Sequence, residues 1–422
     1  MTARAHVLFV TYNGLLEPLG LRQGLAYLEP LADEFRFTVL SFEKTDRASD
    51  PAAWAGIEGR LAASGIEWRP LPYHSRPSVP ATVYDVWAGV SEGRRLHRST
   101  RIDAVHARGY IPGAIAWRLS ERLGCPWLFD IRGLMADEYV DGGIWTEGSL
   151  PWRITRWTER RLLRSATATV TLTEAIRPEI ERRLAESGRS GPEPISSVIP
   201  TCVDTRLFRP DPEARRRERT RLGWGDELVA IYSGSVGTWY ASQPMADYVA
   251  ALHAQRPDLR LLLLLNGPDD ELRRDLATRG VPDTSIITRN AAPDDVPACL
   301  AAADIGMAFI HPSPSKRASS PTKVAEYLAT GLLAVVNRGV GDLDSLADEE
   351  AVVVAESLDA EALRLAAEET LKRLPIDPDT PRELATGSFD LLGTGSARYR
   401  EIYRGMLATR DSAGPHTTGG DR

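Results

Sequence analysis

Residues 319–331 read Ser-Ser-Pro-Thr-Lys-Val-Ala-Glu-Tyr-Leu-Ala-Thr-Gly and lie between two apolar runs typical of buried strands, Ile305–Ile310 and Leu332–Val336. This order of residue types predicts a loop, a proline at an early helical position, a helix of about three turns and a glycine stop. A helix N-terminus opened by small hydroxyl residues presents free backbone N–H groups and a partial positive charge. We therefore expect this end of the helix to bind an anion, and phosphate is the usual one.

Two charged residues of this helix indicate what the anion belongs to. Lys323 places a mobile positive charge in the first turn, next to the backbone of Ser319–Thr322. Glu326 follows one turn later, where its carboxylate could accept hydrogen bonds from a diol such as a ribose. Diphosphate and ribose together predict a nucleotide. The plainer interpretation is an exposed Lys323–Glu326 ion pair, which would contribute only a few tenths of a kcal/mol.

Strand–helix alternation runs through the chain twice. The apolar runs are continuous rather than strictly alternating, as in strands buried on both faces. The first series of strands is expected at His6–Tyr12, Phe35–Phe42, Asp103–His106, Pro126–Ile131, Ala166–Thr171 and Ser196–Ile199, and the second at Leu228–Tyr232, Leu259–Leu265, Ser285–Thr288, Ile305–Ile310, Leu332–Val336 and Ala351–Ala355. This pattern predicts an α/β fold with two parallel sheets covered by helices. Ligands of such sheets sit beyond the carboxyl ends of the strands.

The length of 422 residues also predicts two domains, because single hydrophobic cores stop growing near ~250–300 residues. We expect a first domain over residues 1–205, a linker rich in Pro and Arg over 206–226, and a second domain over 227–385. A separate amphipathic helix is expected within 386–410. The polar, Gly-rich tail 411–422 is expected to be disordered.

Composition narrows the class of protein. The formal net charge is −7, so a nucleic-acid-binding surface is not expected. Cys125, Cys202 and Cys299 are far apart, which argues against a zinc site or a disulfide framework. The N-terminus does not resemble a signal peptide, and no apolar run is long enough to cross a bilayer. We expect a soluble, cytoplasmic protein.

Several segments, taken in their order along the chain, resemble those of one known family. They are His6–Tyr12 with Pro18-Leu-Gly-Leu-Arg-Gln23, Phe129-Asp-Ile-Arg-Gly133 with Asp137 and Glu138, Val198-Ile-Pro-Thr-Cys-Val-Asp204 with Phe208 and Pro210, Tyr232-Ser-Gly-Ser-Val-Gly-Thr-Trp-Tyr240, Ala301–Asp304 and Ser319–Gly331. The chain is thus similar, over roughly residues 6–407, to the glycosyltransferase family 4 group. These are retaining, nucleotide-sugar-dependent enzymes with the GT-B fold. The Ser-x-Pro-x-Lys loop resembles that of one bacterial branch.

The resemblance implies an architecture and a reaction. In the GT-B fold, two Rossmann-like domains face each other across a cleft, and the last helix crosses back to the first domain. The implied reaction is hexosyl transfer from a nucleoside-diphosphate sugar to an acceptor, with retention and without a metal or other cofactor, in bacterial glycan or glycoconjugate biosynthesis. The acceptor could be a glycan, a lipid-linked molecule or a small molecule.

The resemblance also implies roles for individual residues. Lys323, Arg22 and Asp130 are candidate catalytic residues, because the two cations could stabilise the departing diphosphate and Asp130 ends a strand on the ligand side. The candidate donor-binding residues are Gly20, Gly234, Ser235, Gly237, Arg289, Ser319, Ser320, Pro321, Thr322, Lys323 and Glu326. Arg132, Asp137 and Glu138 are candidate acceptor-binding residues.

Two departures from the family pattern affect the donor site. The family often carries a glutamate at the position of Ala318, where it contacts the donor sugar. A Lys-Gly pair is usual after the second glycine loop, but Trp239-Tyr240 stands there instead. The cation for the phosphate must therefore come from another residue, and Lys323 and Arg22 are the candidates.

Plainer interpretations remain open for several of these residues. Arg22 could pair with Glu17, and Asp130 with Arg132 could form a structural salt bridge. His106 is best interpreted as a satisfied core histidine.

A further helix is basic and bears two tryptophans; it contains Trp152, Arg153, Arg156, Trp157, Arg160, Arg161 and Arg164. It could rest peripherally on an anionic membrane surface, at the inner face, although a core helix with solvated arginines is favoured.

Two other functions fit the same residues. A nucleotide-sugar epimerase or hydrolase of the same fold would consume donor without an acceptor. A non-catalytic partner protein would bind the nucleotide-sugar without turnover, as Ala318 and the absent Lys-Gly pair would allow.

Overall fold

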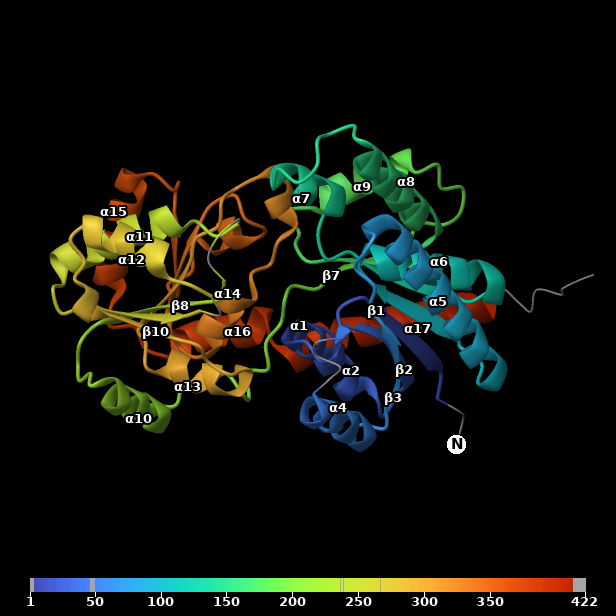
Figure 1. Cartoon of the computed structure of the whole chain (residues 1–422), viewed down its shortest axis with the longest axis horizontal. Helices are drawn as coiled ribbons and strands as arrows, with labels where there is room; N and C mark the ends of the chain where they lie inside the picture. The colour runs from blue at the N-terminus through green and yellow to red at the C-terminus, as the bar shows by residue number, and fades with distance from the viewer. Residues whose placement is uncertain (1–3, 46–49, 236, 238, 266, 413–422) are drawn as a thin grey trace, which may run out of the picture. The chain divides into compact units, whose positions relative to one another are not determined.

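The computed structural model describes residues 4–45, 50–235, 237, 239–265 and 267–412. The chain divides into two compact units (Figure 1): unit 1 consists of Met1–Ile199 with Gly395–Arg422, and unit 2 of Pro200–Thr394. Each unit is built on one parallel sheet with helices packed against it, so the predicted fold class is confirmed. Among the described residues, every helix is too short or too polar to cross a bilayer.

Unit 1 contains a seven-stranded sheet in the order β3-β2-β1-β4-β5-β6-β7. The strands are β1 His6–Thr11, β2 Arg36–Glu43, β3 Glu67–Pro72, β4 Ala104–Arg108, β5 Trp127–Asp130, β6 Ala168–Thr171 and β7 Ile195–Val198. All six strands predicted for this half are present. β3 was missed because it is an edge strand in which the charged Glu67 and Arg69 are followed by Pro70 and Pro72, a sequence typical of a loop.

The helices of unit 1 include a layer of three neighbours, α5, α6 and α8. They pack closely at glycines: a Cβ on Gly89 of α5 would lie 2.6 Å from Ile115 of α6, and one on Gly113 of α6 would lie 2.7 Å from Leu162 of α8. The helices of this unit are α1 Pro18–Gly20, the π-helical Leu21–Leu25, α2 Ala26–Leu28, α4 Pro51–Ala63, α5 Ser78–Ser99, α6 Tyr110–Leu123, α7 Met135–Asp141, α8 Leu150–Ser165, α9 Arg177–Glu186 and α17 Ala397–Ser412.

The chain's return to unit 1 begins at Gly395, so the segment predicted at 386–410 starts in unit 2. Helix α17 then packs against β4 and β7. Of the predicted tail, residues 413–422 lie outside the described residues.

Unit 2 contains a six-stranded sheet in the order β10-β9-β8-β11-β12-β13. Its strands are β8 Val229–Ser233, β9 Arg260–Leu264, β10 Ile286–Arg289, β11 Ile305–Ala308, β12 Leu333–Asn337 and β13 Val352–Ala355, and each was predicted. Its α-helices are α10 Pro212–Leu222, α11 Ser242–Gln255, α12 Asp270–Thr278, α13 Val296–Ala301, α14 Thr322–Ala329, α15 Ala360–Arg373 and α16 Asp379–Ser388. Buried apolar side chains cover both faces of the sheet, which explains the continuous Val/Ile/Leu runs.

The segment 206–226, predicted as a linker, is instead part of unit 2. Its helix α10 packs against α13. Arg215 and Arg219 of α10 hold Asp304 at the start of β11, with Nη2–carboxylate distances of 2.5 and 2.9 Å. These two ion pairs therefore attach α10 to the rest of unit 2.

Candidate functional site

The first turn of α14 lies against the end of β8 and forms the centre of the candidate site. Helix α14 is shorter than predicted: Pro321 is its N-cap, and Gly331, with φ +87°, follows its end. Lys323 is only 6% exposed. Its ammonium nitrogen lies 4.1 Å from the ring centroid of Tyr232 and 3.8 Å from that of Tyr240.

Gly234 makes room for this ammonium group. Its φ is +138°, and a Cβ there would lie 2.8 Å from Lys323 Nζ. Glycine is therefore required for backbone conformation and for space. Gly234 and Lys323, two of the candidate donor-binding residues, therefore lie next to each other.

The buried ammonium group of Lys323 has no hydrogen-bond partner in the described part of the chain. Burial lowers the pKa of Lys323 to about 7, although the nearby Glu326 raises it in part. A buried cation without a hydrogen-bond acceptor is costly, and an anion bound at this point would remove the cost.

Glu326 lies one turn after Lys323 and is 8% exposed. Because both side chains are buried, the interpretation of an exposed Lys323–Glu326 ion pair is wrong. Among the described residues, no side chain caps the N-terminus of α14. Ser319, Ser320 and Thr322 are half-buried around it, and Ser320 Oγ accepts a hydrogen bond of 3.0 Å from the backbone N–H of Thr201.

Tyr327 fixes the orientation of α14 on the sheet. Its hydroxyl accepts a hydrogen bond from the Ser233 N–H at 3.0 Å and donates to the Met307 carbonyl at 3.2 Å. A Cβ on Gly306 would lie 2.3 Å from the Tyr327 ring, so a glycine in β11 is needed for this packing. One side chain thereby ties the helix to both β8 and β11.

A second lysine, Lys316, was not among the predicted site residues. Its ammonium nitrogen lies 3.7 Å from the ring centroid of Trp239, and the side chain is buried. Trp239 and Tyr240, which replace the usual Lys-Gly pair, therefore each face one lysine. Two consecutive aromatics at a position where a cation is expected are the sequence signal that could have indicated this arrangement.

The remaining donor-site candidates of unit 2 differ in placement. The carbonyl of Ser235 accepts a hydrogen bond of 2.5 Å from Tyr232, and Gly237, with φ +108°, is exposed and bridges to Tyr240. Arg289 ends β10, the edge strand, and donates to Glu218 at 2.8 Å. Burial would lower the pKa of Arg289, but Glu218 raises it. Arg289 therefore has an internal partner, and its contact with the donor stays a prediction.

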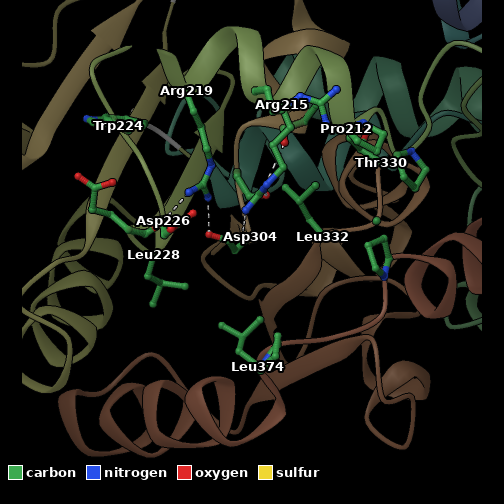
Figure 2. A pocket seen from close by; sticks show the side chains of 18 of the residues that line it. Pro212, Arg215, Arg219, Trp224, Asp226, Leu228, Asp304, Thr330, Leu332 and Leu374 are labelled. Atoms are coloured by element: carbon green, nitrogen blue, oxygen red, sulfur yellow. Dashed lines mark hydrogen bonds and ion pairs between the residues drawn. The ribbon is translucent and has the colours of Figure 1, made fainter. Parts of the chain in front are cut away.

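A pocket of about 900 Å³ lies at the opposite, amino-terminal edge of the unit 2 sheet (Figure 2). Asp304 and Leu332 line it just before β11 and β12. The labelled arginines, Arg215 and Arg219, point at Asp304 and donate to it. The charges of these two arginines are therefore already compensated by Asp304.

Gly20 and Arg22 lie in the turn after β1. A Cβ on Gly20 would lie 2.1 Å from the Gly14 carbonyl oxygen, so glycine is required by this close approach of two backbone segments. Arg22 is half-buried in the π-helical turn. Glu17 forms an ion pair of 2.9 Å with Lys44.

Asp130 is completely buried beneath α17. Tyr399 donates a hydrogen bond of 2.9 Å to its Oδ2, while nitrogen atoms of Arg108 and Arg132 lie 3.4 and 3.6 Å from its carboxylate. Burial would raise the pKa of Asp130, but Arg132, His106 and Arg108 together lower it. Asp130 is therefore held by internal partners, and a catalytic role for it stays a prediction.

The other residues of unit 1 also form internal contacts. His106 Nδ1 hydrogen-bonds to the Tyr403 hydroxyl at 2.7 Å, as a core histidine would. Arg183 donates to Asp137 at 3.0 Å and also binds the buried Glu159. Asp137 is therefore already engaged in an ion-pair network. Glu138, also in the first turn of α7, lies against Gly133, where a Cβ would be 2.7 Å from its carboxylate.

Comparison with known proteins identifies two domains in the order expected from the sequence. The model of the glycosyl transferase 4-like domain matches residues 22–190. The model of glycosyl transferases group 1 matches residues 227–373. Together these two matches cover most of the chain.

Two curated relatives are glycosyltransferases. The GDP-mannose-dependent alpha-(1-6)-phosphatidylinositol monomannoside mannosyltransferase of Mycolicibacterium smegmatis is 28% identical over 42% of this chain and 47% of its own length. The D-inositol 3-phosphate glycosyltransferase of Thermobispora bispora is 26% identical over 76% of this chain and 70% of its own length. The chain thus spans only about half the length of the first relative.

Solved structures show the same fold along nearly the whole chain. Sucrose-phosphate synthase from Thermosynechococcus elongatus superposes with a TM-score of 0.70 at 17% identity, covering 96% of this chain and 100% of that one. HepE from Anabaena, in complex with UDP-glucose, gives a TM-score of 0.64 at 15% identity, covering 96% and 99%. The matched domain models, the relatives and this fold together place the chain in glycosyltransferase family 4, with the GT-B fold.

Proposed function

We propose that the protein transfers a hexosyl unit from a nucleoside-diphosphate sugar to an acceptor hydroxyl, with retention and without a metal ion. The observation that carries this proposal is the buried, unpartnered ammonium group of Lys323 at the uncapped N-terminus of α14. A diphosphate at this position would receive a full positive charge and the partial charge of the helix end.

In the proposed reaction, the bond between the anomeric carbon and the diphosphate oxygen breaks, and its electron pair stays on the diphosphate. Lys323 and the N-terminal N–H groups of α14 stabilise this charge as it develops. The acceptor oxygen bonds to the anomeric carbon on the same face, and its proton moves to the departing phosphate. Glu326 binds the ribose, and Ser319–Thr322 surround the phosphates.

The comparisons guide the choice of substrates to test. One relative is named for GDP-mannose and one solved neighbour contains UDP-glucose, so both nucleotides belong in a donor screen. The relatives are also named for inositol-containing acceptors, which are therefore the first acceptors to try.

Ala318 keeps a second function open, namely binding of the nucleotide-sugar without transfer. This residue is buried and has no functional group that could contact a sugar hydroxyl. A binding protein would retain the Lys323 site and lack turnover with every acceptor.

The test combines thermal-shift screening and transfer assays. UDP, GDP, dTDP, ADP and their hexoses are offered to the wild type, to Lys323→Met and to Lys372→Met, which removes an exposed lysine of α15. We expect one nucleoside diphosphate to stabilise the wild type and Lys372→Met but not Lys323→Met. Equal stabilisation of all three proteins, or of none, overturns the donor site. Donor loss without an acceptor would identify a hydrolase or epimerase instead.

A further inference from the structure

The outward face of α8 combines large apolar side chains with arginines. Leu150 is 70% exposed and Trp157 is 49% exposed, and Ile154 is exposed between them. At 3.6 residues per turn these three lie on one side of the helix, and Arg153, Arg160, Arg161 and Arg164 lie on the same side. The opposite side carries the buried Glu159, Leu162 and Leu163. The exposed apolar residues are thus additional to those that α8 uses for packing.

Helix α5 repeats this arrangement. Its exposed apolar residues are Val79, Val83, Tyr84 and Trp87, and Arg94 and Arg98 are exposed further along the helix. Buried Ala81, Asp85, Gly89, Gly93 and Leu96 lie on the inner side. In both helices, most of the outward arginines follow the apolar residues.

The two helices belong to one layer of unit 1, with α6 between them. Trp117 of α6 contacts Trp157 of α8 with ring centroids 6.4 Å apart. Both α5 and α8 end just before a strand begins, so both start at the carboxyl edge of the sheet. The apolar residues therefore gather near that edge. We call the exposed set the basic aromatic surface; it comprises Val79, Val83, Tyr84, Trp87, Leu150, Ile154 and Trp157 with Arg94, Arg98, Arg153, Arg160, Arg161 and Arg164.

The arginines of the basic aromatic surface are not neutralised by the protein. In the described part of the chain, none of these six guanidinium groups forms an ion pair with a carboxylate. Neighbouring acids are already engaged, as Glu92 with Arg95 and Glu121 with Arg118. The chain as a whole has a net charge of −7. A local excess of cations in an acidic protein indicates a negatively charged partner.

We propose that the basic aromatic surface docks on an anionic lipid bilayer, with its tryptophans and aliphatic side chains in the interfacial region and its arginines on lipid headgroups. Tryptophan and arginine side by side match the bilayer interface, which offers apolar and anionic groups at similar depth. A second copy of the chain would bring two sets of uncompensated arginines together, which disfavours a symmetric dimer through this surface. The proposal does not depend on the donor site.

Vesicle co-sedimentation of the full chain tests this docking. Phosphatidylcholine vesicles with and without phosphatidylglycerol are compared, at low and at high salt. We expect binding only to the vesicles that contain phosphatidylglycerol, and weaker binding at high salt. Equal binding to both vesicles, or to neither, overturns the proposal.

Two variants of unit 1, each compared with a control in unit 2, test whether the basic aromatic surface contacts the bilayer. Replacing Arg160, Arg161 and Arg164 with Gln should weaken partitioning about a hundredfold, from about a factor of five for each arginine. Trp87→Ser with Trp157→Ser should weaken it about tenfold or more. The control for the arginine variant is the double variant Arg216→Gln with Arg217→Gln, in unit 2. The control for the tryptophan variant is Leu365→Ser, also in unit 2. Both controls change exposed residues.

Circular dichroism confirms that each variant is folded, and analytical ultracentrifugation reports self-association. Unchanged vesicle binding of both unit 1 variants overturns the proposal. The proposal is also overturned if the wild type forms a dimer, the tryptophan variant does not, and neither binds vesicles. The surface would then be a protein interface. Loss of vesicle binding with intact nucleotide binding separates this proposal from the donor site.

Discussion

The ammonium group of Lys323 lies over the ring of Tyr240, 3.8 Å from its centroid. Tyr240 is the second residue of the Trp239-Tyr240 pair, which stands where the family usually has a Lys-Gly pair. Its ring supports the ammonium group of Lys323. Such a contact contributes about 0.5–2 kcal/mol. It keeps Lys323 beside Gly234 without a hydrogen bond, and the ammonium remains available to an anion.

Lys323→Met should abolish most of the affinity for the nucleoside diphosphate without unfolding the protein. A charge-assisted hydrogen bond contributes about 1.5–3 kcal/mol, so Kd should rise about tenfold to a hundredfold. Methionine fills a similar space and removes an unpaired buried charge, so the free energy of unfolding should stay equal or increase. Isothermal titration calorimetry measures the affinity, with Lys372→Met as the control. An unchanged Kd contradicts the assignment.

Donor affinity should fall as the pH rises above about 7. Burial lowers the pKa of Lys323 to about 7 from its usual value near 10.5, so the empty site loses its proton in this range. An anion binds the protonated form, and at high pH binding must first take up a proton. Titrations between about pH 6 and about pH 9 should show this weakening in the wild type only. A parallel pH dependence in Lys323→Met would exclude Lys323 as its source.

The same pKa predicts how Lys323 contributes to the pH dependence of stability. Between about pH 7 and the unfolded value near 10.5, the unfolded chain holds a proton on Lys323 that the folded chain lacks. The contribution of Lys323 to stability therefore rises with pH through this window. Denaturation curves should show that the free energy of unfolding of the wild type increases relative to that of Lys323→Met as the pH is raised. A constant difference would mean that Lys323 titrates normally in the folded protein.

Sequence reasoning was accurate where local pattern determines the outcome. Every strand except β3 follows from a buried apolar run, and Lys323 and Glu326 are placed by their spacing on one helix. It was less successful for residues at strand ends, because any polar residue there could face a ligand or an internal partner. Arg289 pairs with Glu218, 71 positions away, and Asp130 with Tyr399, 269 positions away. No local pattern reveals such partners.

Gly234→Ala should disturb both stability and donor binding. The new methyl group would lie 2.8 Å from Lys323 Nζ, and φ +138° is unfavourable for alanine. We expect a loss of about 1–3 kcal/mol in the free energy of unfolding, and weaker nucleotide binding because Lys323 must move. Gly280→Ala is the control: it shares a positive φ, +82°, but its Cβ would meet open space. It should lose stability and keep nucleotide affinity. Equal affinity losses in both variants would refute the specific role of Gly234.

Asp130→Asn should destabilise the protein by about 3–5 kcal/mol, because it leaves Arg108 and Arg132 buried beside a neutral amide. Tyr399→Phe removes the hydrogen bond from α17 to the same carboxylate. If the two residues act together, the double variant should lose less stability than the sum of the single losses, with a coupling of about 0.5–3 kcal/mol. Chemical denaturation of the four proteins measures this cycle.

The decisive comparison is transfer per folded molecule at a temperature where Asp130→Asn remains folded. A structural Asp130 leaves this rate within a few-fold of the wild type, whereas a catalytic one would lower it far more than the lost folded fraction explains.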